Sequence, residues 1–184
     1  MEILMWAVVA VILLMVLWLV MVYNGLISLR LRAENALAQI DVMMTKRFDL
    51  IPNLVATVKG YAKHEREVFE NVTKARAAMS GAGTLNEKAA ANNMLTKALK
   101  TLFAVAEAYP ALRANENFVK LQDELTHLEE QIAYSRSFYN DTVQMYNTKL
   151  QVFPDSFVAN TFGFVGKDFF GAPSKAKEVP KVEF

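Results

Sequence analysis

The chain has 184 residues, no cysteine, and a net charge of +1 from 20 basic and 19 acidic residues. The lack of cysteine excludes disulfides, thiolate metal sites and cysteine nucleophiles, and the balanced charge gives no field that would attract nucleic acid or an acidic substrate. Seven glycines and five prolines, among long runs of Ala, Leu, Glu, Lys and Gln, favour helix over sheet. We therefore expect an all-α fold and no nucleic-acid partner.

The N-terminal stretch is apolar without interruption over residues 3–23. At about 1.5 Å of rise per residue, such a helix reaches roughly 30 Å, the thickness of the hydrocarbon core of a bilayer. Trp6 near one end, and Trp18 with Tyr23 near the other, would place amphipathic rings at the two lipid–water boundaries. This pattern predicts a single-pass transmembrane anchor over residues 1–24.

Two alternatives fit this stretch less well. A buried core helix seldom runs so far without a polar residue. A secretory signal peptide needs a basic start and a small-residue cleavage site, whereas the start here is Met1-Glu2 and no small-x-small pair closes the apolar run. We therefore expect an anchor that is not cleaved.

A long amphipathic helix is expected to follow the anchor, with apolar residues at spacings of three and four. Its stripe consists of Leu29, Ala33, Ala36, Leu37, Ile40, Met44 and Phe48. Lys46 and Arg47 lie off this stripe. Because proline removes a backbone donor and disfavours helical angles in the residue before it, we expect a corner at Ile51, with Pro52 opening a second helix. A kinked but continuous helix is the alternative.

The second helix is expected to carry apolar residues in a heptad rhythm from Leu54 to Met79. Glu65 interrupts the rhythm, and a carboxylate on a core-facing stripe must be paired, neutralised or placed at the surface. We predict a buried polar cluster of Glu65 with Arg136 and Asn140 of a later helix, which would fix the register of the bundle. The alternative is that Glu65 lies at the rim.

A third helix is expected over residues 87–108, after a flexible loop, and a fourth begins at Asn115, a favourable N-cap. The fourth helix has a long apolar stripe: Phe118, Leu121, Leu125, Leu128, Ile132, Ser135, Tyr139, Thr142 and Tyr146. Short connections between amphipathic helices predict an antiparallel bundle of about four long helices over residues 25–152.

The C-terminal segment, residues 153–184, is rich in phenylalanine. Six such rings fall within eighteen residues, at Phe153, Phe157, Phe162, Phe164, Phe169 and Phe170. So many rings need a partner surface, which could be the end of the bundle, a neighbouring subunit or the membrane interface. We expect an oligomer or membrane contact here, followed by a flexible terminus.

Several short strings are spread over nearly the whole chain. They include Glu34-Asn35-Ala36, Arg47-Phe48-Asp49-Leu50-Ile51-Pro52-Asn53-Leu54-Val55, Lys59-Gly60-Tyr61-Ala62-Lys63-His64-Glu65, Phe138-Tyr139-Asn140 and Phe162-Gly163-Phe164. Together these strings resemble the LemA family. The resemblance implies a helical bundle on an N-terminal membrane segment, no established catalysis, and kinship with a magnetosome protein implicated in forming membrane invaginations.

Residues that could carry chemistry are few, since His64 and His127 are the only histidines. A zincin site needs His-Glu-x-x-His, but Val68 stands where the second histidine should. A metal site assembled from His64, Glu65, Glu67 and His127 across two helices is the alternative, although solvated helix faces explain these residues more simply. We expect no enzymatic activity, no metal and no cofactor.

The sequence thus favours a membrane-anchored structural protein that forms a large homo-oligomer through its bundle and aromatic tail, and that organises or curves the membrane. The alternative is an adaptor or regulatory partner of a membrane protease or another membrane enzyme. Four cations follow the anchor, at Arg30, Arg32, Lys46 and Arg47. By the positive-inside rule, we expect the bundle on the cytoplasmic side of a bacterial inner membrane, with the periplasmic side as the alternative.

Overall fold

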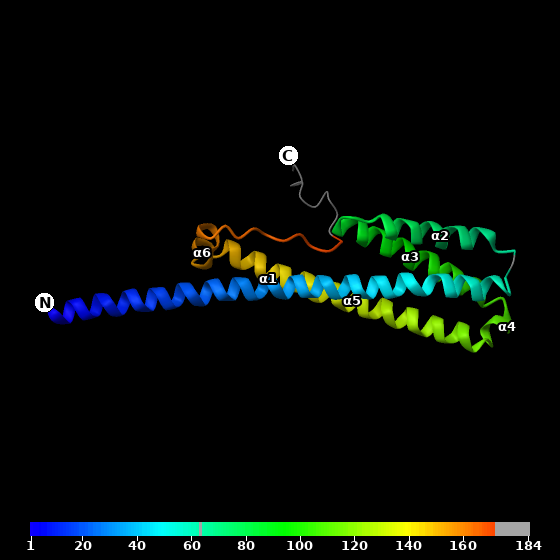
Figure 1. The fold of residues 1–184 in the computed structure, drawn as a ribbon, viewed down its shortest axis with the longest axis horizontal. Coiled ribbons are helices and arrows are strands. Elements are labelled where there is room, and N and C mark those ends of the chain that lie inside the picture. Colours follow the sequence, from blue (N-terminus) through cyan, green and yellow to red (C-terminus); the bar gives the residue numbers. More distant parts are fainter. Residues whose placement is uncertain (63, 172–184) are drawn as a thin grey trace, which may run out of the picture. The chain divides into compact units, whose positions relative to one another are not determined.

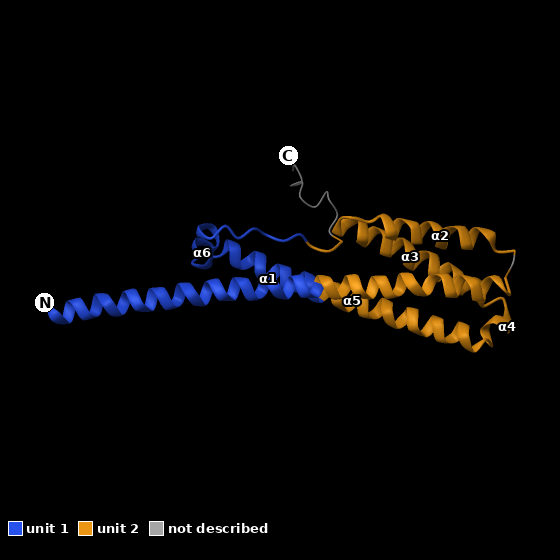
Figure 2. Ribbon diagram, in the orientation of Figure 1, with its two compact units in different colours: residues 1–36, 138–168 blue, residues 37–137, 169–184 orange. Residues whose placement is uncertain are grey.

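The computed structural model of the chain describes residues 1–62 and 64–171, and every regular element among them is a helix. The helices are α1 (Glu2–Lys59), α2 (Arg66–Gly81), α3 (Leu85–Ala106), α4 (Pro110–Arg113), α5 (Glu116–Gln151) and α6 (Asp155–Thr161) (Figure 1). They form two compact units (Figure 2). Unit 1 combines residues 1–36 with 138–168, and unit 2 combines residues 37–137 with the chain from Phe169. The all-α prediction is confirmed.

Unit 2 is a helical bundle, built around one core to which α1, α2, α3, α4 and α5 all contribute. Residues 25–36 and 138–152, which the prediction placed in the bundle, belong to unit 1. Its fully buried apolar side chains include Ile51, Leu54, Val58, Val72, Leu95, Leu102, Leu112 and Leu125. Here α1 and α5 are antiparallel: Ser135 bonds Met43, whereas the earlier Glu129 bonds the later Arg47. The stripe predicted for the last long helix is the buried face of α5.

The corner predicted at Ile51 and Pro52 is wrong, because α1 continues through Pro52 to Lys59. Met44 and Ile51 before the proline and Leu54 after it are all buried on the same face of α1. Packing of this face in the core therefore holds the helix together. Pro52 itself is exposed. The carbonyl that loses its hydrogen bond at the proline therefore lies on the outer side of the helix.

The chain turns instead between Lys59 and Arg66. The backbone N–H of Gly60 donates to the carbonyl of Thr57 at 3.3 Å, which tightens the last turn of α1. Glu65 is the N-cap residue of α2. The polar residue that broke the predicted heptad therefore marks the start of a helix rather than a position inside one.

Local sequence signals explain the starts of α3, α4 and α5. The Thr84 hydroxyl accepts a hydrogen bond from the backbone of Glu87 at 3.2 Å, and the Glu87 carboxylate accepts one from the backbone of Thr84 at 2.9 Å, a capping box at α3. The Asn115 side chain accepts from the backbone N–H of Phe118 at 3.0 Å, which confirms the predicted N-cap of α5. Pro110 occupies the first turn of the short α4.

Unit 1 packs the part of α1 around Val22 and Leu26 against the end of α5, with α6 and the following tail. Its core consists of Val22, Leu26, Tyr146, Val158 and Ala159. The N-terminal part of α1 is long and apolar enough to cross a membrane, with a mean hydropathy of 3.0 and none of its window buried in the protein. A core helix of a soluble protein would be mostly buried, so that alternative does not fit.

Candidate functional site

A buried arginine links three helices of unit 2. Arg47 on α1 is only 2% exposed, and its Nη1 donates to the side-chain oxygens of Asn92 at 2.8 Å and Thr96 at 3.2 Å on α3. The same nitrogen pairs with the carboxylate of Glu129 on α5. The Thr96 hydroxyl donates to the other oxygen of Glu129 at 3.0 Å. We call these four residues the arginine network.

The charge of Arg47 is balanced inside the bundle. Burial lowers the pKa of the guanidinium from its ordinary value, and the Glu129 carboxylate acts in the opposite direction. Glu129 is about one third exposed, so the network reaches the surface of α5. The network was not predicted, because Arg47 was placed off the apolar stripe. Its spacing nevertheless matches the buried face, since Arg47 follows Met44 by three residues and precedes Ile51 by four.

The structure does not bring together the three residues of the predicted polar cluster. Glu65 accepts a hydrogen bond from the Tyr109 hydroxyl at 3.0 Å, just beyond the end of α3, and this bond raises the pKa of Tyr109. Arg136 donates to the side chain of Asn93 at 3.4 Å, in the first half of α3. Glu65 and Arg136 are thus roughly 20 Å apart along that helix. Asn140 belongs to unit 1.

The two histidines are exposed side chains. His64 lies in the turn before α2, and a ring nitrogen of His127 is bonded to the side-chain amide of Gln131 on the same helix at 2.9 Å. Among residues 1–62 and 64–171, no group of three or more His, Asp or Glu side chains could hold a metal ion.

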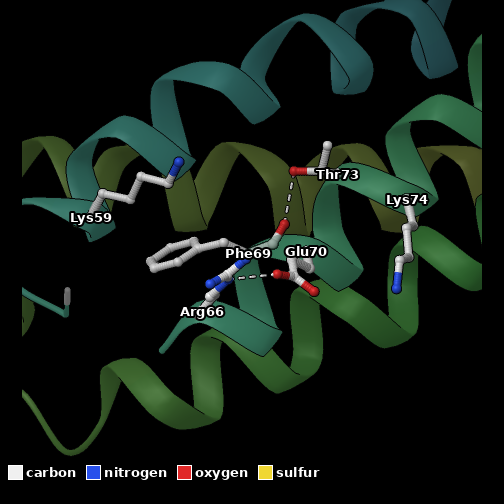
Figure 3. Close-up of a pocket in the computed structure, with 6 residues that line it drawn as sticks. All are labelled: Lys59, Arg66, Phe69, Glu70, Thr73 and Lys74. Atoms are coloured by element: carbon white, nitrogen blue, oxygen red, sulfur yellow. Dashed lines mark hydrogen bonds and ion pairs between the residues drawn. The ribbon is translucent and has the colours of Figure 1, made fainter. Parts of the chain in front are cut away.

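A surface hollow of about 620 Å³ lies between the end of α1 and the start of α2 (Figure 3). Phe69 forms its floor, with the Lys59 ammonium 5.5 Å from the ring centre. On the α2 side of the hollow, the Arg66 guanidinium donates to the Glu70 carboxylate at 2.8 Å. Lys74 lies at the opposite end from Lys59 in this view. Its charged groups are exposed, as on an ordinary solvated surface.

The tail that follows α6 is hydrogen-bonded along α5 within unit 1. The side-chain amide of Asn147 donates to the carbonyl of Lys167 at 2.8 Å and accepts from its N–H at 2.9 Å. The Tyr139 hydroxyl donates to the carbonyl of Asp168 at 2.8 Å. The Lys167 ammonium bonds Glu34 on α1 at 3.0 Å, which lowers the pKa of that carboxyl. These bonds fix the tail on both long helices.

The tail phenylalanines divide into packed and exposed rings. Phe170 is buried in unit 2, with the Arg136 guanidinium 5.0 Å from its ring centre. Phe164 packs on the core of unit 1 and lies 5.6 Å from the ring of Tyr23. The chain's own helices are therefore the partner surface for part of the tail.

The remaining rings are largely open. Phe153 is 87% exposed, Phe157 65% and Phe162 51%, and only Phe162 has a ring partner among the described residues, Tyr23 at 5.0 Å. Phe169 is also partly exposed. The three most exposed rings flank or belong to α6, whose Val158 packs in the core of unit 1.

The LemA family model matches residues 36–184. The chain belongs to the LemA family. Because this match begins after the apolar stretch, the membrane segment of this LemA-family chain is recognised from its own hydropathy. The arginine network and the bonded tail both lie mostly within the matched residues.

Curated relatives of this LemA-family chain include three magnetosome proteins. MamQ 1 and MamQ 2 of Paramagnetospirillum magneticum are each 24% identical to it over 178 residues, and MamQ of Magnetospirillum gryphiswaldense is 23% identical. Each match covers 83% of this chain and 65% of the relative. The chain thus spans slightly less than two thirds of the length of these relatives.

The predicted anchor residues of this LemA-family chain differ in their surroundings. Trp6 is exposed, whereas Trp18 and Tyr23 are half-buried against the core of unit 1. One end of the apolar stretch therefore stands free, and the other is packed against α6 and the tail.

Proposed function

We propose that this LemA-family chain is a membrane-anchored, non-enzymatic structural protein that associates with copies of itself and so organises or curves the membrane. α1 runs from the apolar stretch to Lys59 without a break, so no loop separates the anchor from the helical bundle. Contacts between copies of the chain would then act directly on the membrane segments. Kinship with magnetosome proteins favours a role at a membrane.

The observation that carries the proposal is an exposed apolar face on α5 in unit 1. Phe138 and Met145 lie seven residues apart, which places them on one side of the helix. Met145 is 58% exposed and Phe138 38%, with the Arg32 guanidinium 5.5 Å from the centre of the Phe138 ring. Neither residue belongs to the core of unit 1. Such a face suits contact with another protein.

A small apolar surface of this kind is sufficient for self-association when the protein is anchored in a membrane. Confinement to a membrane raises the effective concentration of one copy around another, just as a linker does. Two apolar side chains on α5, together with the exposed Leu31 on α1 of the same unit, would not associate copies strongly in dilute solution. They could do so among copies that share one membrane plane.

The test is the size of the full-length protein extracted in a mild detergent, with and without a charge on this face. We expect assemblies larger than a monomer, and we expect Met145→Lys to shift them to smaller sizes. Gln144→Lys is the matched control, because it adds the same charge at an exposed neighbouring position and should leave the size unchanged. A strict monomer at high protein concentration would contradict self-association.

Cross-linking in the native membrane separates this function from that of an adaptor. A self-associating protein gives products whose masses are multiples of one chain. An adaptor of a membrane protease or other membrane enzyme gives instead a product with a different polypeptide, and this outcome would favour the alternative.

A further inference from the structure

The exposed rings of the tail gather where unit 1 packs on the apolar stretch. We call residues 152–162 the aromatic turn; it contains α6 and the exposed Phe153, Phe157 and Phe162. Its buried residues Val158 and Ala159 share a core with Val22 and Leu26, and Trp18 packs against that core. The aromatic turn is therefore held directly against α1.

The position of this contact along α1 determines its depth in a bilayer. Trp18 lies five residues before Tyr23, the last residue of the apolar stretch, which is about 7.5 Å along the helix axis. When the stretch spans a bilayer, a segment packed at Trp18 and Val22 lies at the depth of the lipid headgroups and the first acyl carbons. Bulk water begins beyond that depth.

The composition of the aromatic turn suits that depth. Between Lys149 and Lys167 the sequence has a single charged residue, Asp155. Asp155 is largely covered and pairs with Lys149 at 3.4 Å. The Thr161 hydroxyl donates to the carbonyl of Phe157 at 2.8 Å, which satisfies its polar group within α6. The exposed surface is thus made of aromatic rings with little charge to hydrate.

We propose that the aromatic turn is a second membrane contact, in which Phe153, Phe157 and Phe162 enter the headgroup–acyl boundary of the bilayer that α1 crosses. The proposal rests on the anchoring part of the proposed function. Lipid is the occupant because packing of α6 on the apolar stretch brings the rings to the bilayer in every copy, whether or not a second copy is present. The contact would hold unit 1 against the membrane surface.

The experiment uses the full-length protein in lipid vesicles with one fluorescent label. Because the chain has no cysteine, each of Phe153→Cys, Phe157→Cys and Phe162→Cys provides a unique site for an environment-sensitive NBD probe. Nitroxide lipids labelled at the headgroup or along the acyl chain then report depth. We expect blue-shifted emission and several-fold stronger quenching by these lipids than for a probe at Ser137→Cys, an exposed residue of unit 2.

A probe at Leu13→Cys, in the middle of the apolar stretch, makes the outcomes distinct. Quenching of this probe without quenching at Phe153, Phe157 and Phe162 would overturn the second contact and leave the anchor intact. No quenching at Leu13 would contradict the anchor itself. Probes at the three phenylalanines that are shielded from both nitroxide lipid and aqueous iodide would be covered by a second copy, which also overturns the proposal.

Folding of each labelled variant is checked by circular dichroism and thermal melting. Phe153 and Phe157 are mostly exposed, so their replacement should leave the melting temperature unchanged. Loss of folding at both positions would show that these rings are structural, and it would overturn the assignment to lipid.

Discussion

Arg47 shows why a charged residue can belong to a helical core. The Arg47 side chain is 2% exposed, and its Nη1 donates to Asn92, Thr96 and Glu129 on two other helices. A buried ion pair of this kind contributes less to stability than its Coulomb energy implies, because both ions lose hydration. Its geometry nevertheless favours one relative position of α1, α3 and α5. We infer that the network sets the register of unit 2.

The network makes a prediction about single and double variants. Glu129→Leu should destabilise the protein by about 3–5 kcal/mol, because it leaves a buried guanidinium without its counter-ion. Adding Arg47→Met removes that unpaired charge. The double variant should therefore unfold at a higher denaturant concentration than Glu129→Leu alone, as measured by chemical unfolding of the detergent-solubilised protein.

Glu130→Leu is the control for this comparison. Glu130 is the exposed neighbour of Glu129 on α5, so its replacement should change the unfolding free energy by less than about 0.5 kcal/mol. Two results would mean that Arg47 does not depend on this carboxylate. One is an equal loss of unfolding free energy in Glu129→Leu and Glu130→Leu, and the other is a double variant less stable than Glu129→Leu.

At the scale of helices, α1 shows that core packing can outweigh the effect of a proline. A proline inside a helix costs about 3 kcal/mol relative to alanine, through a lost hydrogen bond and a steric clash. Here Ile51 and Leu54 are buried on the same face of α1 and repay part of that cost. Pro52 thus remains a weak point within a continuous helix.

Pro52→Ala should therefore stabilise the protein, by about 1–3 kcal/mol, because alanine restores the backbone hydrogen bond to the preceding turn. The measurement is the unfolding midpoint of the full-length protein. Asn53→Ala, an exposed change in the same turn, is the control and should have a much smaller effect. A chain that needed a corner at Pro52 would instead lose stability on this replacement.

The sequence was sufficient for the helices but not for all their ends. Periodicity found the buried face of α5, and the cap at Asn115 gave the start of that helix, because these signals are local. The turn after Lys59 was missed because its only strong breaker is Gly60, while the proline that attracted the prediction is tolerated inside α1. The partners of Arg47 and Glu65 depend on which helices meet, and a single helix pattern does not contain that information.

At the scale of the whole molecule, the charges that follow the anchor bear on which side of the membrane holds the bundle. Arg47 is buried and paired with Glu129, so it adds little to the charge that the membrane surface meets. Arg30, Arg32 and Lys46 are exposed, and the first two lie within ten residues of the apolar stretch. The positive-inside rule counts such residues, and it still favours the cytoplasmic side.

We therefore predict opposite labelling patterns for two single-cysteine variants expressed in bacterial cells. A membrane-impermeant maleimide should label Glu2→Cys in intact cells, whereas Ser137→Cys should react only after the inner membrane is permeabilised. The unmodified chain, which has no cysteine, measures the background. Labelling of Ser137→Cys in intact cells would place the bundle on the outer side, and the cations near the anchor would then have to be neutralised there by Glu34, which already pairs with Arg30 and Lys167.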